Sequence, residues 1–161
     1  MKRALILAAA LVLASSAQAQ NAGQVGRIQV GQSCPGCNLF QADMANKEFK
    51  NRNFAKSRLR QADFSASVMN GTNFSGADMR DVNAYGVVFT GVNMAGADLT
   101  NATFVGAYLQ GANFRGAKLG GANFSGAEMD RAIGLTQAQL GQACADPSTR
   151  LPKGLSAPAC R

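Results

Sequence analysis

The stretch from Leu39 to Met129 places a large apolar residue at every fifth position, and no insertion breaks the phase. Eighteen of the nineteen positions hold Leu, Met or Phe, and Ala84 is the exception. An α-helix would space its apolar residues by 3.6 positions and a half-buried β-strand would alternate them, so neither element explains the pattern. A constant period over this length indicates a repeat protein whose short units stack on one another.

The other positions of each repeat also have a constant chemistry. A small residue, most often Ala, stands two positions before the large apolar residue, Asp or Asn usually stands one position before it, and Gly stands two positions after it in ten repeats. Gly, Asn and Asp accept the backbone angles of tight corners, and side chains alternate along an extended segment. We therefore expect a corner every five residues, with one large and one small side chain pointing inward from each short side. Val82, Val87 and Val92 stand where Ala is usual, and we expect these larger neighbours to fill the missing volume around Ala84.

This pattern resembles the pentapeptide-repeat family, whose motif is A-[D/N]-L-x-x. Segments that match the motif are Ala97–Asn101 (Ala-Asp-Leu-Thr-Asn) and Ala112–Gly116 (Ala-Asn-Phe-Arg-Gly), and the resemblance covers about ninety-five residues. It implies an all-β solenoid over residues 34–134, namely a right-handed quadrilateral β-helix with four repeats in each coil and about five coils. Residues twenty apart would then lie above one another, in a stack of about 24 Å at the usual spacing of strands.

The first nineteen residues have the three regions of a secretory signal peptide. Lys2 and Arg3 are followed by an apolar run from Ala4 to Ala14 and by the cleavage-site pattern Ala17–Ala19. The apolar run is too short to span a membrane, and no other segment is apolar enough to do so. We expect a bacterial protein that is exported to the periplasm or secreted.

The segments on either side of the repeats are expected to differ from them. Residues 20–33 are polar and glycine-rich, which predicts a flexible leader with a short strand over Arg27 to Val30. Residues 135–161 are predicted to cap the last coil, because an open solenoid edge invites aggregation. Thr136 and Gln139 form a capping-box pattern that predicts a helix from about Gln137 to Ala145.

Two further expectations follow for this cap. Residues 134–140 and 151–155 are similar to the tails of exported bacterial members of the same family. A capped C-terminal end leaves mainly the N-terminal coil end as a contact for a dimer.

Four cysteines form two candidate disulfides. Cys34 and Cys37 have the spacing of a thioredoxin-type redox site, which keeps thiol–disulfide exchange open as an alternative function. They also fall on the inward positions of the repeat register, which favours a structural disulfide. Cys144 and Cys160 most simply pair with each other in the cap. Zinc would need ligands from both ends of the solenoid, so no metal site is expected.

A basic run crosses the first coil and is opposed only by Glu48. Such a run can bind anionic envelope material, or it can solvate the coil and block edge-to-edge pairing. Three residues of the first coil, Lys47, Arg52 and Ser57, also stand at the small inward position, so their side chains turn outward or the coil is irregular. The six basic residues of the run are Lys47, Lys50, Arg52, Lys56, Arg58 and Arg60.

Composition argues against catalysis. The chain has no His, which removes the usual general base, the Ser–His and Cys–His nucleophile pairs and the commonest metal ligand. Asp78 and Asp98 would be neighbours on one side of the solenoid, yet Asp and Asn at this position are explained by corner hydrogen bonds. Without Lys2 and Arg3 the chain carries fourteen Lys and Arg against nine Asp and Glu, a net charge of +5.

These observations predict a non-enzymatic exported scaffold or binding protein that presents a rigid surface to a partner. The partner is expected to be a protein or an anionic component of the envelope. Nucleic acid is a poor partner for an exported chain without Trp or an aromatic stacking surface. No catalytic residue and no cofactor is expected.

Overall fold

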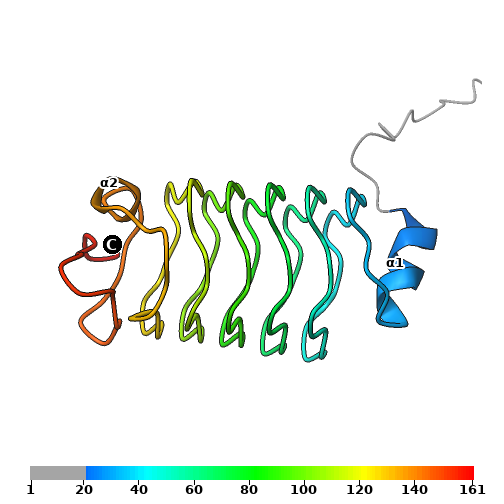
Figure 1. Ribbon diagram of the computed structural model, residues 1–161, viewed down its shortest axis with the longest axis horizontal. Coiled ribbons are helices and arrows are strands. Elements are labelled where there is room, and N and C mark those ends of the chain that lie inside the picture. Colours follow the sequence, from blue (N-terminus) through cyan, green and yellow to red (C-terminus); the bar gives the residue numbers. More distant parts are fainter. Residues whose placement is uncertain (1–20) are drawn as a thin grey trace, which may run out of the picture.

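The computed structural model describes residues 21–161 and shows an elongated stack of coils with a helix at each end (Figure 1). The helices are α1 (Ala22–Gln29) and α2 (Gln137–Leu140). The predicted signal peptide lies outside the described residues. No helix in the described part of the chain has the length and apolar content needed to cross a bilayer.

Each coil contains twenty residues. Parallel bridges join residues twenty apart, from the pair Asn38 and Arg58 to the pair Asn113 and Ile133. Every bridge is an isolated pair, and residues 21–161 contain no continuous strand. The expected solenoid of twenty-residue coils is present, but the strands implied by an all-β fold are not confirmed in the described residues. A corner after every fifth residue leaves too few extended residues on each side of the coil to form a longer ladder.

The corners explain why glycine is frequent two positions after the large apolar residue. Nineteen successive residues at every fifth position from Gly36 to Gly126 have a positive φ, between 52° and 70°. Glycine adopts this conformation without a steric penalty, but eight of the nineteen are other residues, Ala66 among them. Asp and Asn side chains support the backbone next to the corners: Asp63 Oδ1, for example, accepts the N–H of Ser65 at 2.8 Å.

The four sides of the coil present four outward columns of bridge residues, and each side is named here after one member. The Arg58 face carries Asn38, Arg58, Asp78, Asp98 and Lys118. The Asp63 face carries Asp43, Asp63, Asn83, Thr103 and Asn123. The Val88 face carries Glu48, Val68, Val88, Tyr108 and Glu128. The Asn73 face carries Asn53, Asn73, Asn93, Asn113 and Ile133.

The inward columns form a continuous core in which Phe rings contact one another between coils. Phe104 and Phe124 stack at 5.3 Å between ring centroids. Ala84 lies in the same column between Phe64 and Phe104, where a third ring would otherwise stand. The ring of Phe89 fills this space, since its centroid lies 6.0 Å from that of Phe64 and 6.4 Å from that of Phe104. The larger neighbours expected to fill the missing volume, Val82, Val87 and Val92, are buried in the same core. Their part in filling it stays a prediction.

The first coil follows the same register as the others. Of the three polar residues at its inward positions, Lys47 is exposed, Arg52 is half-buried and Ser57 is buried. The hydroxyl of Ser57 donates to the carbonyl of Cys34 at 2.8 Å, which satisfies it inside the coil. The lysine thus turns outward while the coil stays regular.

The N-terminal end differs from the sequence-based expectation. Helix α1 replaces the predicted flexible leader, and the strand expected over Arg27 to Val30 does not form. The side chain of Asn21 caps the helix by accepting the N–H of Gln24, and Ile28 is buried against the first coil. The side-chain oxygen of Gln24 accepts the N–H of Asn38 at 2.7 Å. Helix α1 therefore covers the N-terminal coil end, where the sequence analysis expected the contact of a dimer.

The C-terminal end forms the predicted cap, although with a shorter helix. The capping box of Thr136 and Gln139 is present, but α2 ends at Leu140 instead of Ala145. The chain then rejoins the stack, because Cys144 forms a bridge with Asn123. Residues 144–160 close a last ring over the solenoid, which we call the terminal ring.

Candidate functional surfaces

Cys34 and Cys37 form a disulfide at the start of the first coil, with their Cα atoms 5.5 Å apart. Both residues belong to the same core cluster as Ile28 of α1, and Cys34 is completely buried. Thiol–disulfide exchange requires an incoming thiolate to reach one sulfur atom. The burial of this pair therefore favours a structural role at the coil end and gives the redox alternative no support.

Cys144 and Cys160 form the second disulfide, with their Cα atoms 4.8 Å apart. This bond joins the two ends of the terminal ring. The two disulfides lie at opposite ends of the solenoid, and residues 21–161 contain no group of three or more His, Cys, Asp or Glu side chains that could hold a metal ion.

The basic run does not form one patch. The repeat register places Lys47 and Lys50 on the Val88 face, Arg52 and Lys56 on the Asn73 face, and Arg58 and Arg60 on the Arg58 face. Two of these charges are also paired: Lys50 contacts Glu48 at 2.6 Å, and Arg60 contacts Asp81 at 3.2 Å. The six basic residues are thus spread over three of the four faces instead of facing one common ligand.

The carboxylates of Asp78 and Asp98 lie in adjacent coils of the Arg58 face, as the register predicts. A hydrogen bond from Arg80 is the main reason why the pKa of Asp78 is lowered. Burial alone would raise the pKa of Asp98, but hydrogen bonds from Thr100 and Lys118 outweigh it and lower the pKa. Both groups are therefore anionic at neutral pH and engaged with local donors, which does not suit a general acid.

The Val88 face departs from the polar chemistry of the other three. Val68, Val88 and Tyr108 occupy successive coils at the position where the other faces carry Asp, Asn, Thr or charged residues, apart from Ile133 at the end of the Asn73 face. Tyr108 is 42% exposed. This substitution removes the corner hydrogen bond that Asp or Asn would accept, and it places an apolar column on the surface.

The apolar column continues around a glycine corner. Tyr85 and Val105 lie in successive coils on the Asp63 face, three residues before Val88 and Tyr108 along the chain. Tyr85 is 59% exposed, and it and Tyr108 are the two tyrosines of the sequence. We call this surface the tyrosine patch; it consists of Val68, Tyr85, Val88, Val105 and Tyr108.

Sequence reasoning missed the tyrosine patch, although the register contained a signal for it. Val88 and Tyr108 stand one position before their large apolar residues, where Asp or Asn is usual. A residue that breaks the corner chemistry in successive coils indicates a surface with another role. The signal is visible only when residues are aligned twenty apart.

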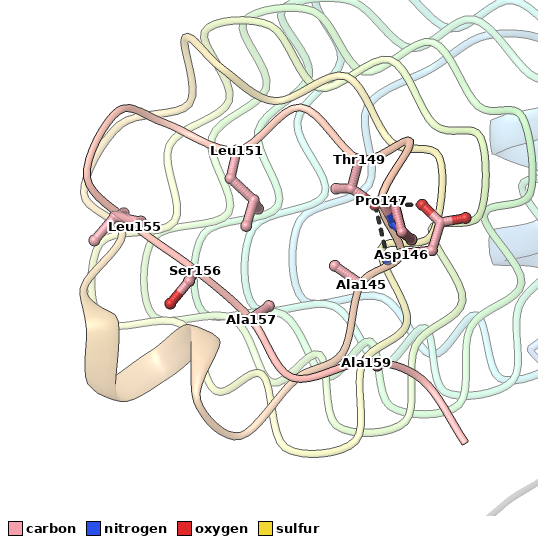
Figure 2. A pocket seen from close by; sticks show the side chains of 9 residues that line it. All are labelled: Ala145, Asp146, Pro147, Thr149, Leu151, Leu155, Ser156, Ala157 and Ala159. Atoms are coloured by element: carbon pink, nitrogen blue, oxygen red, sulfur yellow. Dashed lines mark hydrogen bonds between the residues drawn. The ribbon is translucent and has the colours of Figure 1, made fainter.

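The terminal ring surrounds a pocket of about 400 Å³ that is open to solvent at the C-terminal end of the solenoid. Figure 2 shows the ring around an opening, with the earlier coils stacked behind it. The side chains of Ala145, Leu151 and Ala157 point into the opening, whereas the carboxylate of Asp146 points away from it. The lining residues are Ala145, Asp146, Pro147, Thr149, Leu151, Leu155, Ser156, Ala157 and Ala159.

Asp146 ties the terminal ring to the last full coil, and this contact should depend on pH. Its carboxylate accepts hydrogen bonds from Ser148, from the N–H of Gly126 and from Thr149, which together lower its pKa from 3.8 to about 2. A carboxylate with a lowered pKa stabilises the folded state above its ordinary pKa and loses that effect as the pH falls through its folded value. We therefore expect the ring to loosen between pH 4 and pH 2.

The amide chemical shift of Gly126 provides the measurement. It should titrate with a midpoint near pH 2, and the titration should vanish in Asp146→Asn. A midpoint at the ordinary value of 3.8 would show that the carboxylate does not hold the ring.

Comparison with known families supports the repeat assignment. One family model, described as pentapeptide repeats (8 copies), matches overlapping segments that together run from residue 34 to residue 106. A second, described as pentapeptide repeats (9 copies), matches residues 89–133. Together the two models cover most of the chain. A search of curated proteins finds no match.

Solved structures of repeat proteins are also similar to this chain. HetL, a pentapeptide repeat protein involved in heterocyst differentiation regulation from Nostoc sp. strain PCC 7120, is 19% identical with a TM-score of 0.43; the alignment covers 81% of this chain and 64% of HetL. Rfr23 from Cyanothece 51142 is 22% identical with a TM-score of 0.35, over 80% of this chain and 97% of Rfr23. A form of QnrB1, a plasmid-mediated fluoroquinolone resistance protein, is 21% identical with a TM-score of 0.46, over 78% of this chain and 77% of QnrB1.

Proposed function

This chain belongs to the pentapeptide-repeat family, and from that premise we propose that it is an exported, non-enzymatic scaffold that binds a protein partner through the tyrosine patch. Export is inferred from the signal-peptide pattern of residues 1–19. The scaffold role is inferred from a stack of coils whose inward positions are filled and whose backbone groups pair from coil to coil.

The tyrosine patch is the observation that carries this proposal. Tyrosine offers a large apolar surface and a hydroxyl while losing little rotamer freedom, so it is enriched among the residues that dominate protein interfaces. The corner glycines Gly86 and Gly106 have open space where a side chain would project. No side chain at these corners separates the Asp63 face from the Val88 face. A partner can therefore contact the patch residues of both faces at once.

The two alternatives from the sequence are weaker candidates. The basic run is spread over three faces of the solenoid, so an anionic surface could contact only part of it at a time. The disulfide of Cys34 and Cys37 is buried in the core. Neither feature gathers large apolar side chains on adjoining faces, as Tyr85 and Tyr108 are gathered in the tyrosine patch.

Site-specific photo-crosslinking tests the proposal. A benzoylphenylalanine replaces Tyr85 in one variant and Ala55, which lies on the outward side of the Asn73 face, in the control variant. Crosslinking in an envelope extract should capture a defined protein from position 85 and not from position 55. The double variant Tyr85→Ser/Tyr108→Ser should then bind that protein about 10-fold to 100-fold more weakly, because two interface tyrosines are lost.

A third variant distinguishes the contribution of the basic run to partner binding from that of the tyrosine patch. It changes the six basic residues between 47 and 60 to Gln and leaves both tyrosines in place. We expect it to bind the captured partner nearly as well as the native protein. Loss of binding in the Gln variant together with full binding by the tyrosine variant would move the site to the first coil and refute the proposal.

A further inference from the structure

The Asp63 face, which carries Tyr85, is the one side of the described coils that has no basic residue. Its outward and corner positions from Asp43 to Gly126 hold two carboxylates, those of Asp43 and Asp63, and no Lys or Arg. Each of the other three faces carries at least two basic side chains, in a chain with sixteen Lys and Arg against nine Asp and Glu. The side on which the tyrosine patch begins is therefore negative, although the protein as a whole is basic.

Asp43 and Asp63 are bridge partners in adjacent coils, about 4.8 Å apart along the stack, and we call them the acidic pair. Each uses its Oδ1 atom to support its own corner: Asp43 accepts the N–H of Ala45 at 3.0 Å, and Asp63 accepts that of Ser65 at 2.8 Å. Neither carboxylate belongs to an ion pair within residues 21–161. Like charges that face each other on neighbouring extended segments are destabilising, so the acidic pair costs stability.

The repeat does not require the charge of the acidic pair. Asn supports the same corner on the Asn73 face, where Asn93 Oδ1 accepts an N–H at 3.1 Å. The Arg58 face also places two carboxylates in adjacent coils, but local cations compensate them. Arg80 contacts Asp78 at 2.7 Å, and Lys118 contacts Asp98 at 3.4 Å. The acidic pair has no such cation from its own chain, which favours a cation supplied by a partner.

The acidic pair lies beside the tyrosine patch, on the side toward the N-terminus. Asp63 forms a bridge with Asn83, two residues before Tyr85, and its carboxylate accepts a hydrogen bond from the side chain of Asn83 at 3.1 Å. At the usual spacing of neighbouring coils, Asp63 and Asp43 lie about 5 Å and about 10 Å from the coil of Tyr85 along the solenoid. A single protein segment that covers the patch can therefore also reach the acidic pair.

From these observations we propose that the protein bound by the tyrosine patch presents two Lys or Arg side chains to Asp43 and Asp63, and an apolar side chain to Tyr85 and Tyr108. The apolar contact supplies most of the affinity, while the charges steer the partner and fix its orientation along the solenoid. This inference rests on the proposed function, because it assigns the chemistry of the partner of the same patch.

Binding kinetics of the protein captured by crosslinking at position 85 test the inference, after that protein has been identified and purified. The variant Asp43→Asn/Asp63→Asn removes both charges and keeps the acceptors at the corners, so the coils should stay folded. We expect it to associate with the partner about 3-fold to 10-fold more slowly at low salt, with a nearly unchanged dissociation rate. At about 1 M salt the difference should disappear, because exposed charges are then screened beyond about 3 Å.

Asp78→Asn/Asp98→Asn is the matched control, since it changes the net charge by the same amount on the Arg58 face. We expect this control to associate at nearly the native rate. Native association by the acidic-pair variant at low salt, or equal slowing in both variants, would overturn the inference and leave the tyrosine patch as the binding site. Capture of a second copy of this chain, or of a crosslinked segment without Lys or Arg, would also overturn it. Failure to capture any protein from position 85 would instead refute the proposed function, and this inference with it.

Discussion

Phe89→Ala is expected to lower the free energy of unfolding by about 3–5 kcal/mol, the range found when a large core aromatic residue is truncated. Phe89 is completely buried, and its ring contacts those of Phe64, Phe74 and Phe104. The neighbouring residue Ala84 cannot expand into the space that the ring leaves. The cavity should therefore remain largely open, which places the expected loss toward the upper end of the range.

Urea denaturation followed by circular dichroism measures this loss. Phe40→Ala is the matched control, because Phe40 lies on the outside of the coil and is only half-buried. We expect the control to lose much less stability than Phe89→Ala. Equal losses in the two variants would mean that Phe89 does not have the packing role described here.

A double-mutant cycle tests whether Phe89 compensates for Ala84. Ala84→Leu alone should destabilise the protein by about 1–3 kcal/mol, because it overpacks a filled core. In the Phe89→Ala background the same substitution fills part of the cavity and should restore stability. The two effects should thus have opposite signs; additive losses would show that the two side chains do not share one space.

The coil register and the core could be predicted because both depend on local regularities. A large apolar residue every five positions determines which side chains point inward, and the glycines two positions after many of them indicate where the chain turns. The pairing of Cys144 with Cys160 was also predictable, since both residues belong to the cap beyond the repeats. Each of these features can be read from spacing along the chain.

Helix α1 could not be predicted in the same way, because its stability depends on a surface that the folded coils create. Its sequence contains Gly23 and Gly26, which oppose helix formation in an isolated segment. The open coil end offers an apolar surface for Ile28, and Asn38 provides an N–H for the side chain of Gln24. Tertiary contacts thus outweigh a weak local preference. The Asn21 cap was the one local signal of the helix.

The candidate surfaces show that residues close in sequence can lie on different faces of the solenoid, while residues twenty apart lie side by side. The basic run is contiguous in sequence, yet its members are distributed over three faces because the chain turns a corner every five residues. Val68, Val88 and Tyr108 are far apart in sequence, yet they lie in successive coils. Charge clusters read along the sequence are therefore unreliable in this fold, and alignment by coil is the informative comparison.

Replacing Cys144 and Cys160 with Ser is expected to destabilise the terminal ring by about 3 kcal/mol. This free energy corresponds to the conformational entropy that the unfolded chain gains when a loop of this length loses its cross-link. The effect should be local, because each coil of a solenoid contacts only its neighbours and its stability is set by those interfaces. We expect residues 144–160 to open while the coils up to Phe124 remain folded.

Hydrogen exchange measures this difference by residue. The N–H groups of Cys144 and Ala145, which donate to Ala122 and Pro158, should lose protection, whereas that of Phe104 in a central coil should not. Replacing Cys34 and Cys37 is the comparison, and its expected cost is only about 2 kcal/mol because the loop is short. A uniform loss of protection along the solenoid would show that the ring and the coils unfold as one unit. The terminal pocket would then depend on the stability of the whole stack, whereas a local loss makes the disulfide the element that keeps the pocket open.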